Sequence, residues 1–280
     1  MSADGAAIVV QELRRPWMAR GLHSGRALKG ALGLLIVLVA WQVSVPLIGL
    51  PEYFYPSALA VWRAFLDLVW KGILPVYLAD SLWRYGAGVG LGSVIGVTLG
   101  MLISLNRAVA RLLAPLINFL YAIVEVAWIP LFVVWWGYGV KAILVSLIYV
   151  VVFPVLYNTI VGIRTVPQVY INAVRSLGGS RWQVITEVLV PAALPNIITG
   201  FRVGAGFAFR GLIFAEMIAA KTGLGYLIFE GTAHHQTART IVGMIGMGLL
   251  WLFVDNIYLK PFERATVERW GTVVSAEERG

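Results

Sequence analysis

Three ionisable residues stand inside long apolar runs of this 280-residue chain: Glu125, Arg210 and Glu216. A charge in hydrocarbon is costly, so such groups usually face a charged partner or an aqueous cavity. One hypothesis is that the Arg210 guanidinium lines a pathway and attracts an anion through its charge and forked N–H donors. The alternative is a structural ion pair between Arg210 and Glu125 or Glu216. The sequence alone leaves both open.

The motifs of several enzyme classes are missing. The chain contains no cysteine, which excludes disulfides, thiolate metal sites and thiol nucleophiles. The pair Lys221-Thr222 follows Ala220 and lacks the glycine-rich loop that cradles phosphates, and neither G-x-S-x-G nor H-E-x-x-H occurs. The adjacent His234 and His235 have no carboxylate cluster beside them, which argues against a metal site. We therefore expect no catalytic residue, no metal and no cofactor bound by this chain.

The composition is that of a membrane protein. Hydrophobic residues make up 59% of the chain and charged residues only 13%, whereas charged residues are about a quarter of a soluble domain. The eleven Trp and eleven Tyr suit the headgroup region, where amphipathic rings are favoured. The net charge of +8 is typical of basic cytoplasmic loops and does not require a nucleic-acid surface. We predict an all-α integral membrane protein.

Six runs with few or no charges are long enough to cross the roughly 30 Å hydrocarbon core as helices. The predicted spans are 31–50, 85–105, 112–138, 142–163, 197–220 and 240–259. A cytoplasmic N-terminal segment (1–30) precedes them, an external interfacial segment (51–80) follows the first, and a cytoplasmic tail (262–280) ends the chain. Pro130 predicts a bend in the third span. Gly88, Gly92, Gly96 and Gly100 form one stripe of the second span, which predicts close packing against another helix.

Basic residues orient these spans. With the N-terminus inside, fifteen of the 22 Lys and Arg residues fall in cytoplasmic segments, six fall outside, and Arg210 lies within a span. This bias follows the rule that cytoplasmic loops are the positive ones. Both termini, and the loop between spans four and five, are therefore predicted to be cytoplasmic.

That loop, residues 171–195, is a polar interruption that reads as a helix, a turn and a second helix. Gly178-Gly179 marks the turn, and Ser180 can cap the second helix by accepting a hydrogen bond from a free amide. Pro191 and Pro195 are expected to close the segment before the fifth span begins. A compact polar element on a cytoplasmic loop is suited to docking a soluble partner.

The segment 171–191 resembles the cytoplasmic signature of the permease subunits of binding-protein-dependent ABC importers. That signature is Glu-Ala-Ala, three residues, Gly, nine residues, an aliphatic residue, any residue, Leu and Pro. The spacing fits, and the corresponding positions here are Asn172, Ala173, Val174, Gly178, Val188, Val190 and Pro191. Val174 replaces the second alanine of the signature, and Val190 replaces its leucine. Asn172 replaces the glutamate, so a docking surface has to be argued from Gly178, Arg175, Arg181 and the helix geometry.

Further stretches look like one subgroup of these permeases, which imports nitrate, sulfonates, taurine or bicarbonate. They are SLGGSRWQV, LPNIITGFRV and AEMIAAKTGLGYLIF, and the resemblance covers about residues 80–261. It implies a type I importer core that pairs with a second permease copy, two cytoplasmic ATPase subunits that hold ATP and Mg, and an external solute-binding protein. It also implies a bacterial cytoplasmic (inner) membrane location. The coupling helix of the family would here contact the ATPase through Asn172, Ala173, Arg175, Gly178, Ser180, Arg181, Glu187 and Pro191.

Two functional hypotheses follow. The first is an ATP-driven importer permease that moves a small, anionic solute inward and is not itself an enzyme. The second is a secondary transporter driven by an ion gradient, in which Glu125 and Glu216 would be proton or sodium sites. The sequence does not identify the solute.

Overall fold

The computed structural model describes residues 23–261, and every regular element in that range is a helix. Most of the predicted N-terminal segment and the predicted tail 262–280 lie outside the described residues. The chain divides into two compact units, Met1–Ala60 and Val61–Gly280.

The first unit contains α2 (His23–Ile48) and the turn that follows it. Apolar side chains such as Leu35, Val39 and Leu47 are exposed on α2, as expected of a helix made for lipid. The Ser44 hydroxyl is hydrogen-bonded to the Tyr55 hydroxyl (2.9 Å), which ties the turn to the helix.

Helix α3 (Ala58–Trp70) follows, at the boundary of the two units. The Ser57 hydroxyl accepts a hydrogen bond from the Ala60 N–H (3.1 Å), so Ser57 caps this helix. Val61 and Leu68 are buried, whereas Trp62 and Trp70 are exposed. Such a helix, apolar on its exposed side as well, suits a membrane interface.

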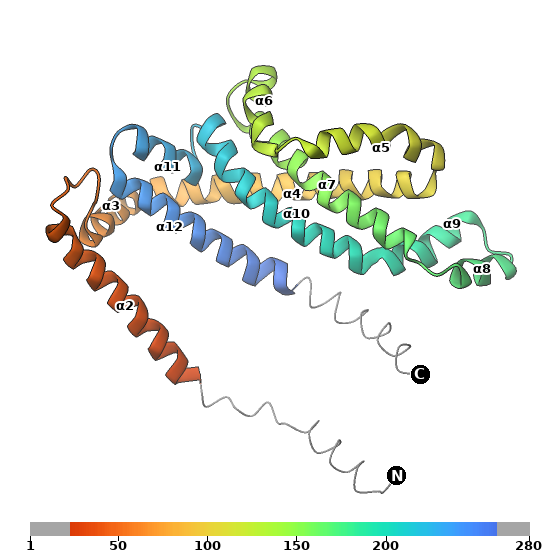
Figure 1. Cartoon of the computed structure of the whole chain (residues 1–280), viewed down its shortest axis with the longest axis horizontal. Helices are drawn as coiled ribbons and strands as arrows, with labels where there is room; N and C mark the ends of the chain where they lie inside the picture. Colours follow the sequence, from red (N-terminus) through yellow and green to blue (C-terminus); the bar gives the residue numbers. More distant parts are fainter. Residues whose placement is uncertain (1–22, 262–280) are drawn as a thin grey trace, which may run out of the picture. The chain divides into compact units, whose positions relative to one another are not determined.

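Three long helices form the core of the second unit: α4 (Ile73–Leu105), α7 (Val140–Arg164) and α10 (Val190–Ala219). Helix α7 packs against both of the others (Figure 1). The predicted glycine stripe of α4 is confirmed as a packing surface. A Cβ added at Gly92 would lie 2.7 Å from the Val151 Cβ, and one at Gly96 would lie 2.8 Å from the Val152 carbonyl oxygen. These glycines let the two backbones approach closely.

Helix α4 is longer than the predicted second span. It has 33 residues and begins at Ile73, twelve residues before the predicted start at Tyr85. Arg84 stands just before the predicted second span and was one of the six basic residues counted as external, but it lies inside the helix. Its side chain is only 5% exposed. The prediction was wrong because it treated a charge as the end of the helix, whereas this charge is paired in the interior.

The predicted third span is broken. It consists of α5 (Arg107–Ala122), a short turn of helix η2 (Glu125–Trp128) and α6 (Ile129–Trp136), and the two parts are bent by 93°. The break lies at Ile123 and Val124, whose backbones are extended, and not at Pro130. Pro130 lies in the first turn of α6, where a missing N–H costs nothing. The expected proline bend was therefore wrong in position.

The break frees backbone groups that need partners. The Leu120 carbonyl at the end of α5 accepts hydrogen bonds from the Ile123 N–H (3.2 Å) and from the Tyr149 hydroxyl of α7 (2.5 Å). Irregular backbone at membrane depth is tolerated where protein or a water-filled cavity satisfies it. Helix α7 thus stabilises the interruption.

The polar loop contains α8 (Gln168–Ser176), α9 (Arg181–Gln183) and the wide turn η3 (Val184–Leu189), which runs directly into α10. Pro191 and Pro195 do not close the segment as predicted, because one apolar helix continues from Arg181 to Ala219. In the wide turn the Val190 N–H reaches back to the Ile185 carbonyl, and Pro191, at the next position, stands in the first turn of α10. The loop is therefore joined rigidly to α10.

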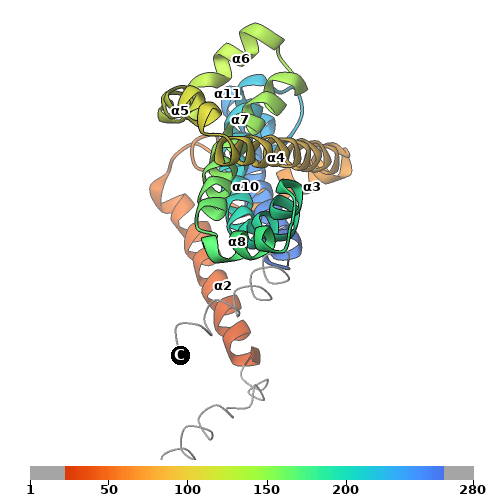
Figure 2. The ribbon, with the colours of Figure 1, turned by 90° about the vertical axis from the view of Figure 1, so that its right-hand side faces the viewer.

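The chain ends, within the described residues, with α11 (Leu224–Ala233), α12 (Thr237–Val254) and the turn η4 (Asp255–Leu259). Helix α11 lies at the end of the second unit opposite to α8 and α9 (Figure 1), and Figure 2 looks onto the end that carries α8. Four described helices are long and apolar enough to cross a membrane, and the broken pair would make a fifth. Six spans and the orientation of the termini stay predictions.

Candidate functional site

A buried polar network joins α4, α10 and the start of α11. The Glu216 carboxylate is fully buried and accepts hydrogen bonds from Arg84 Nη1 (2.9 Å), from the Ser81 hydroxyl (2.8 and 2.9 Å) and from the Gly225 N–H (2.9 Å). Arg84 also donates to the carbonyl and the hydroxyl oxygen of Thr222 (2.6 and 2.7 Å). Such additional hydrogen bonds offset part of the cost of burying an ion pair. Among the described residues, Arg84 Nε is buried without a hydrogen-bond partner.

Two glycines let the chain close over this carboxylate. Gly223 has φ of +115°, and a Cβ there would collide with the Glu216 carboxylate. A Cβ at Gly225 would lie 2.6 Å from the Glu216 Cβ. The Ser81 hydroxyl accepts the Leu224 N–H (2.9 Å), which fixes the backbone between them. The network therefore anchors the start of α11 to α4 and α10.

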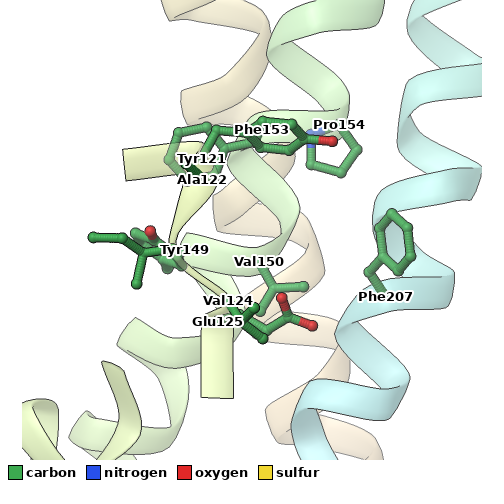
Figure 3. A pocket seen from close by; sticks show the side chains of 10 residues that line it. Tyr121, Ala122, Val124, Glu125, Tyr149, Val150, Phe153, Pro154 and Phe207 are labelled. Carbon is green, nitrogen blue, oxygen red and sulfur yellow. The ribbon is translucent and has the colours of Figure 1, made fainter. Parts of the chain in front are cut away.

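Glu125 lies at the break of the third span and lines a cavity of about 200 Å³. Figure 3 shows its carboxylate pointing toward α10, where Phe207 lies across the cavity, and shows the Tyr121 and Phe153 rings at the other end. Tyr149 also lines this space. The cavity thus combines one acidic group with four aromatic rings.

Arg210 lies on the exposed face of α10, on a stripe with Val203, Phe207, Phe214 and Ile218. Its guanidinium carbon is 6.0 Å from the centre of the Phe207 ring. It lines two adjacent hollows between α10 and α12, of about 490 and 270 Å³, with Trp251 common to both. No ion pair joins it to Glu125 or Glu216 in the described part of the chain. Of the two alternatives for Arg210, the ion pair with Glu216 is not formed in the described residues, where Glu216 pairs with Arg84.

The polar loop is a rigid helical hairpin. Gly178 has φ of +80° and makes the turn, and Gly179 stands where a Cβ would collide with Val174. Ser180 caps the second helix as predicted: its hydroxyl accepts the Gln183 N–H (3.3 Å), and the Gln183 side chain accepts the Ser180 N–H (2.8 Å). A small apolar core holds the hairpin to the ends of α7 and α10; it consists of Ile163, Val166, Ile171, Val184, Leu189 and Ala193.

The residues predicted for docking lie on the outside of this hairpin. Asn172, Ala173, Arg175, Gly178, Ser180, Arg181 and Glu187 are exposed, and Pro191 is half-buried. Two apolar side chains that the sequence analysis did not single out are strongly exposed beside them: Leu177 (89%) and Trp182 (70%). Exposed large apolar groups at the tip of a rigid element are a common feature of protein interfaces.

Residues 88–259 match the family described as "Binding-protein-dependent transport system inner membrane component". The chain belongs to this family. The permease is 30% identical over 237 residues to the aliphatic sulfonates transport permease protein SsuC of Bacillus subtilis, which covers 85% of this chain and 86% of the relative. It is 30% identical to the taurine transport system permease protein TauC of Escherichia coli, over 86% of this chain and 89% of the relative. It is 32% identical to the bicarbonate transport system permease protein CmpB of Synechococcus elongatus, over 68% and 66%.

Solved structures show the same fold. The permease superposes on a chain of the inward-facing MetNI methionine ABC transporter with a TM-score of 0.54, at 19% identity, over 70% of this chain and 97% of that one. An amino acid ABC transporter gives a TM-score of 0.56 at 18% identity, over 72% and 98%. The core of the permease therefore has the fold of ABC importer transmembrane subunits.

Ser81 and Arg84 are the site residues that sequence reasoning missed. They are three positions apart, so in a helix they lie on one face. That spacing would have been informative only if the second span had been extended upstream past Arg84. Their partner Glu216 was singled out as an intramembrane charge, but its environment depends on a contact across 132 residues that no local pattern reveals.

Proposed function

We propose that this permease forms the translocation pathway of an ATP-driven importer for small anionic solutes. The observation that carries the proposal is its likeness, over most of its length, to permease proteins named for sulfonates, taurine and bicarbonate transport. A nitrate import permease protein, NrtB of Synechocystis, is 29% identical over 84% of this chain. The solutes in these names are small and carry an anionic group.

In this proposal the permease works with a second permease copy, two cytoplasmic ATPase subunits and an external solute-binding protein. ATP and Mg belong to the ATPase, because this chain lacks a phosphate-binding loop. The assembly lies in the bacterial cytoplasmic (inner) membrane, with six spans and both termini inside. Sulfonates, nitrate, bicarbonate and carboxylates all remain within the proposed solute class.

The hairpin of α8 and α9 is proposed as the coupling helix. Its exposed tip offers Arg175, Arg181, Leu177 and Trp182 to a partner. Since the hairpin continues without interruption into α10, a movement of the ATPase would be passed to α10 as a rigid-body displacement. This supports the proposed transmission from nucleotide to pathway.

The ion-gradient alternative is less well supported. Glu216 is fully buried, paired with Arg84 and held by Ser81 and Gly225, so it is not placed to exchange protons or sodium with water. Glu125 borders a cavity, whereas Glu216 is fully buried.

Affinity purification tests the proposal. The tagged permease should retain an ATPase subunit in detergent, and the complex should hydrolyse ATP faster when loaded binding protein is added. Isolation of the permease without any ATPase, together with uptake that depends on an ion gradient, would refute it.

A further inference from the structure

The Glu125 cavity has the composition of a site for an organic cation. A carboxylate and the faces of aromatic rings both attract ammonium groups, the first by charge and the second through the ring quadrupole. In Figure 3 the Glu125 carboxylate and the rings of Tyr121 and Phe153 lie at opposite ends of one cavity, with Phe207 facing it from α10. The ring centres of Tyr121 and Phe153 are 5.7 Å apart.

Glu125 has no ion-pair partner within residues 23–261, although it is half-buried. Glu216, the other glutamate of the spans, is fully paired. Charged groups at membrane depth are normally paired or exposed to a water-filled pathway. The Glu125 carboxylate therefore faces a space where a cation can enter.

This cavity and Arg210 lie at similar depth. The Gly139 N–H donates to the Ala219 carbonyl (2.7 Å), so the start of α7 and the end of α10 lie at one level. At 1.5 Å per helical residue, Tyr149 and Arg210 lie about 14–15 Å from that level and Phe207 about 18 Å. All three therefore lie well inside the long helices α7 and α10, away from the helix ends that meet at this level.

Phe207 is shared by the two spaces. It borders the Glu125 cavity, and it also borders the hollow beside Arg210. Arg210 presents forked donors that match sulfonate, carboxylate or nitrate oxygens. An acidic and a basic group whose neighbouring spaces share one phenyl ring are complementary to a solute that has both charges.

Resting on the proposed importer function, we propose that the pathway contains a dipolar solute site, in which the Glu125 cavity takes the ammonium end and Arg210 the anionic end of a small zwitterion. The solute class that fits is an aminoalkanesulfonate or a similar amino acid. Nitrate and bicarbonate lack the cationic end, so they would leave Glu125 unpaired.

Three probes separate the two halves of the site: tetramethylammonium, ethanesulfonate and 2-aminoethanesulfonate. Their binding to the purified permease in lipid nanodiscs can be titrated by saturation-transfer NMR. E125Q should weaken the binding of tetramethylammonium about tenfold, which corresponds to about 1.4 kcal/mol of binding free energy. It should leave the binding of ethanesulfonate unchanged. R210Q should weaken the binding of ethanesulfonate and leave the binding of tetramethylammonium unchanged. Both variants should weaken the binding of 2-aminoethanesulfonate.

Two further variants control the experiment. E52Q makes the same change at an exposed position of the first unit and should bind all probes as the wild type does. Tyr121→Leu keeps both charges but removes one ring of the Glu125 cavity. It should weaken the binding of tetramethylammonium and of 2-aminoethanesulfonate and leave the binding of ethanesulfonate unchanged. Size-exclusion profiles identical to the wild type exclude misfolding as the cause.

The inference is overturned if the wild type does not bind tetramethylammonium, or if E125Q binds it as well as the wild type does. It is also overturned if the double variant E125R/R210E restores transport that each single change abolishes, because the two side chains would then pair with each other between permease copies. ATP-driven import of a simple anion without any ammonium binding would refute this inference and leave the proposed function intact.

Discussion

Replacing Arg84 by Met should strongly destabilise the permease. The side chain is 5% exposed and its Nη1 lies 2.9 Å from a carboxylate that is fully buried. In R84M the Glu216 carboxylate keeps Ser81 and Gly225 as donors but loses its only close positive charge among the described residues. Removal of one partner from a buried ion pair costs about 3–5 kcal/mol. At about 2–4 °C per kcal/mol for a domain of this size, the thermal midpoint should fall by about 6–20 °C.

The assay is thermal unfolding of the detergent-purified permease, followed by tryptophan fluorescence. D80N is a control in the same cluster, because Asp80 is 30% exposed and 3.5 Å from Arg84, and its loss should cost at most about 1 kcal/mol. The double variant R84M/E216L removes both charges and should be more stable than R84M, since apolar pairs often replace buried ion pairs without loss. The reasoning would be refuted if R84M had the thermal midpoint of the wild type. It would also be refuted if the loss of stability in the double variant equalled the sum of the losses in the two single variants.

Other positions give sharper local tests. G92A adds a methyl group against Val151 and should cost about 1–3 kcal/mol by overpacking, whereas G90A on the same helix meets nothing within 4 Å and should be neutral or slightly stabilising; thermal midpoints check both. G178P cannot adopt φ of +80°, because proline fixes φ near −65°, so it should insert in the membrane but uncouple ATP hydrolysis from uptake. W182A should leave the thermal midpoint unchanged, because the indole is exposed, and should weaken retention of the ATPase during purification. Normal uptake by G178P and normal ATPase retention by W182A would remove the hairpin from the coupling route.

Local pattern was sufficient for features that depend on one helix. The four-residue glycine spacing predicted the face of α4 that meets α7, because close backbone approach needs a stripe of small residues whatever the partner is. Ser180 was predicted as a cap because its hydroxyl and the Gln183 amide are near neighbours in the chain. The family resemblance, carried by spacing around Gly178 and by the stretch that contains Glu216, was confirmed by the comparisons.

Prediction from local sequence pattern failed where contacts between distant segments determine the structure. Pro191 and Pro195 read as helix ends, but the wide turn before them lets the helix continue. The break at Ile123 has no proline or glycine beside it, and it is stabilised by the Tyr149 hydroxyl from another helix. Arg84 read as the limit of a span because its partner Glu216 is far away in sequence. Such features become visible only when the helices are packed.

The most direct test of the proposed function is uptake of a labelled solute into liposomes that contain the permease and its ATPase. With 2-aminoethanesulfonate or ethanesulfonate as solute, accumulation should require ATP, the ATPase and external binding protein together. It should persist when ion gradients are dissipated. Uptake that proceeds without the ATPase and stops when the proton or sodium gradient is removed would contradict the account.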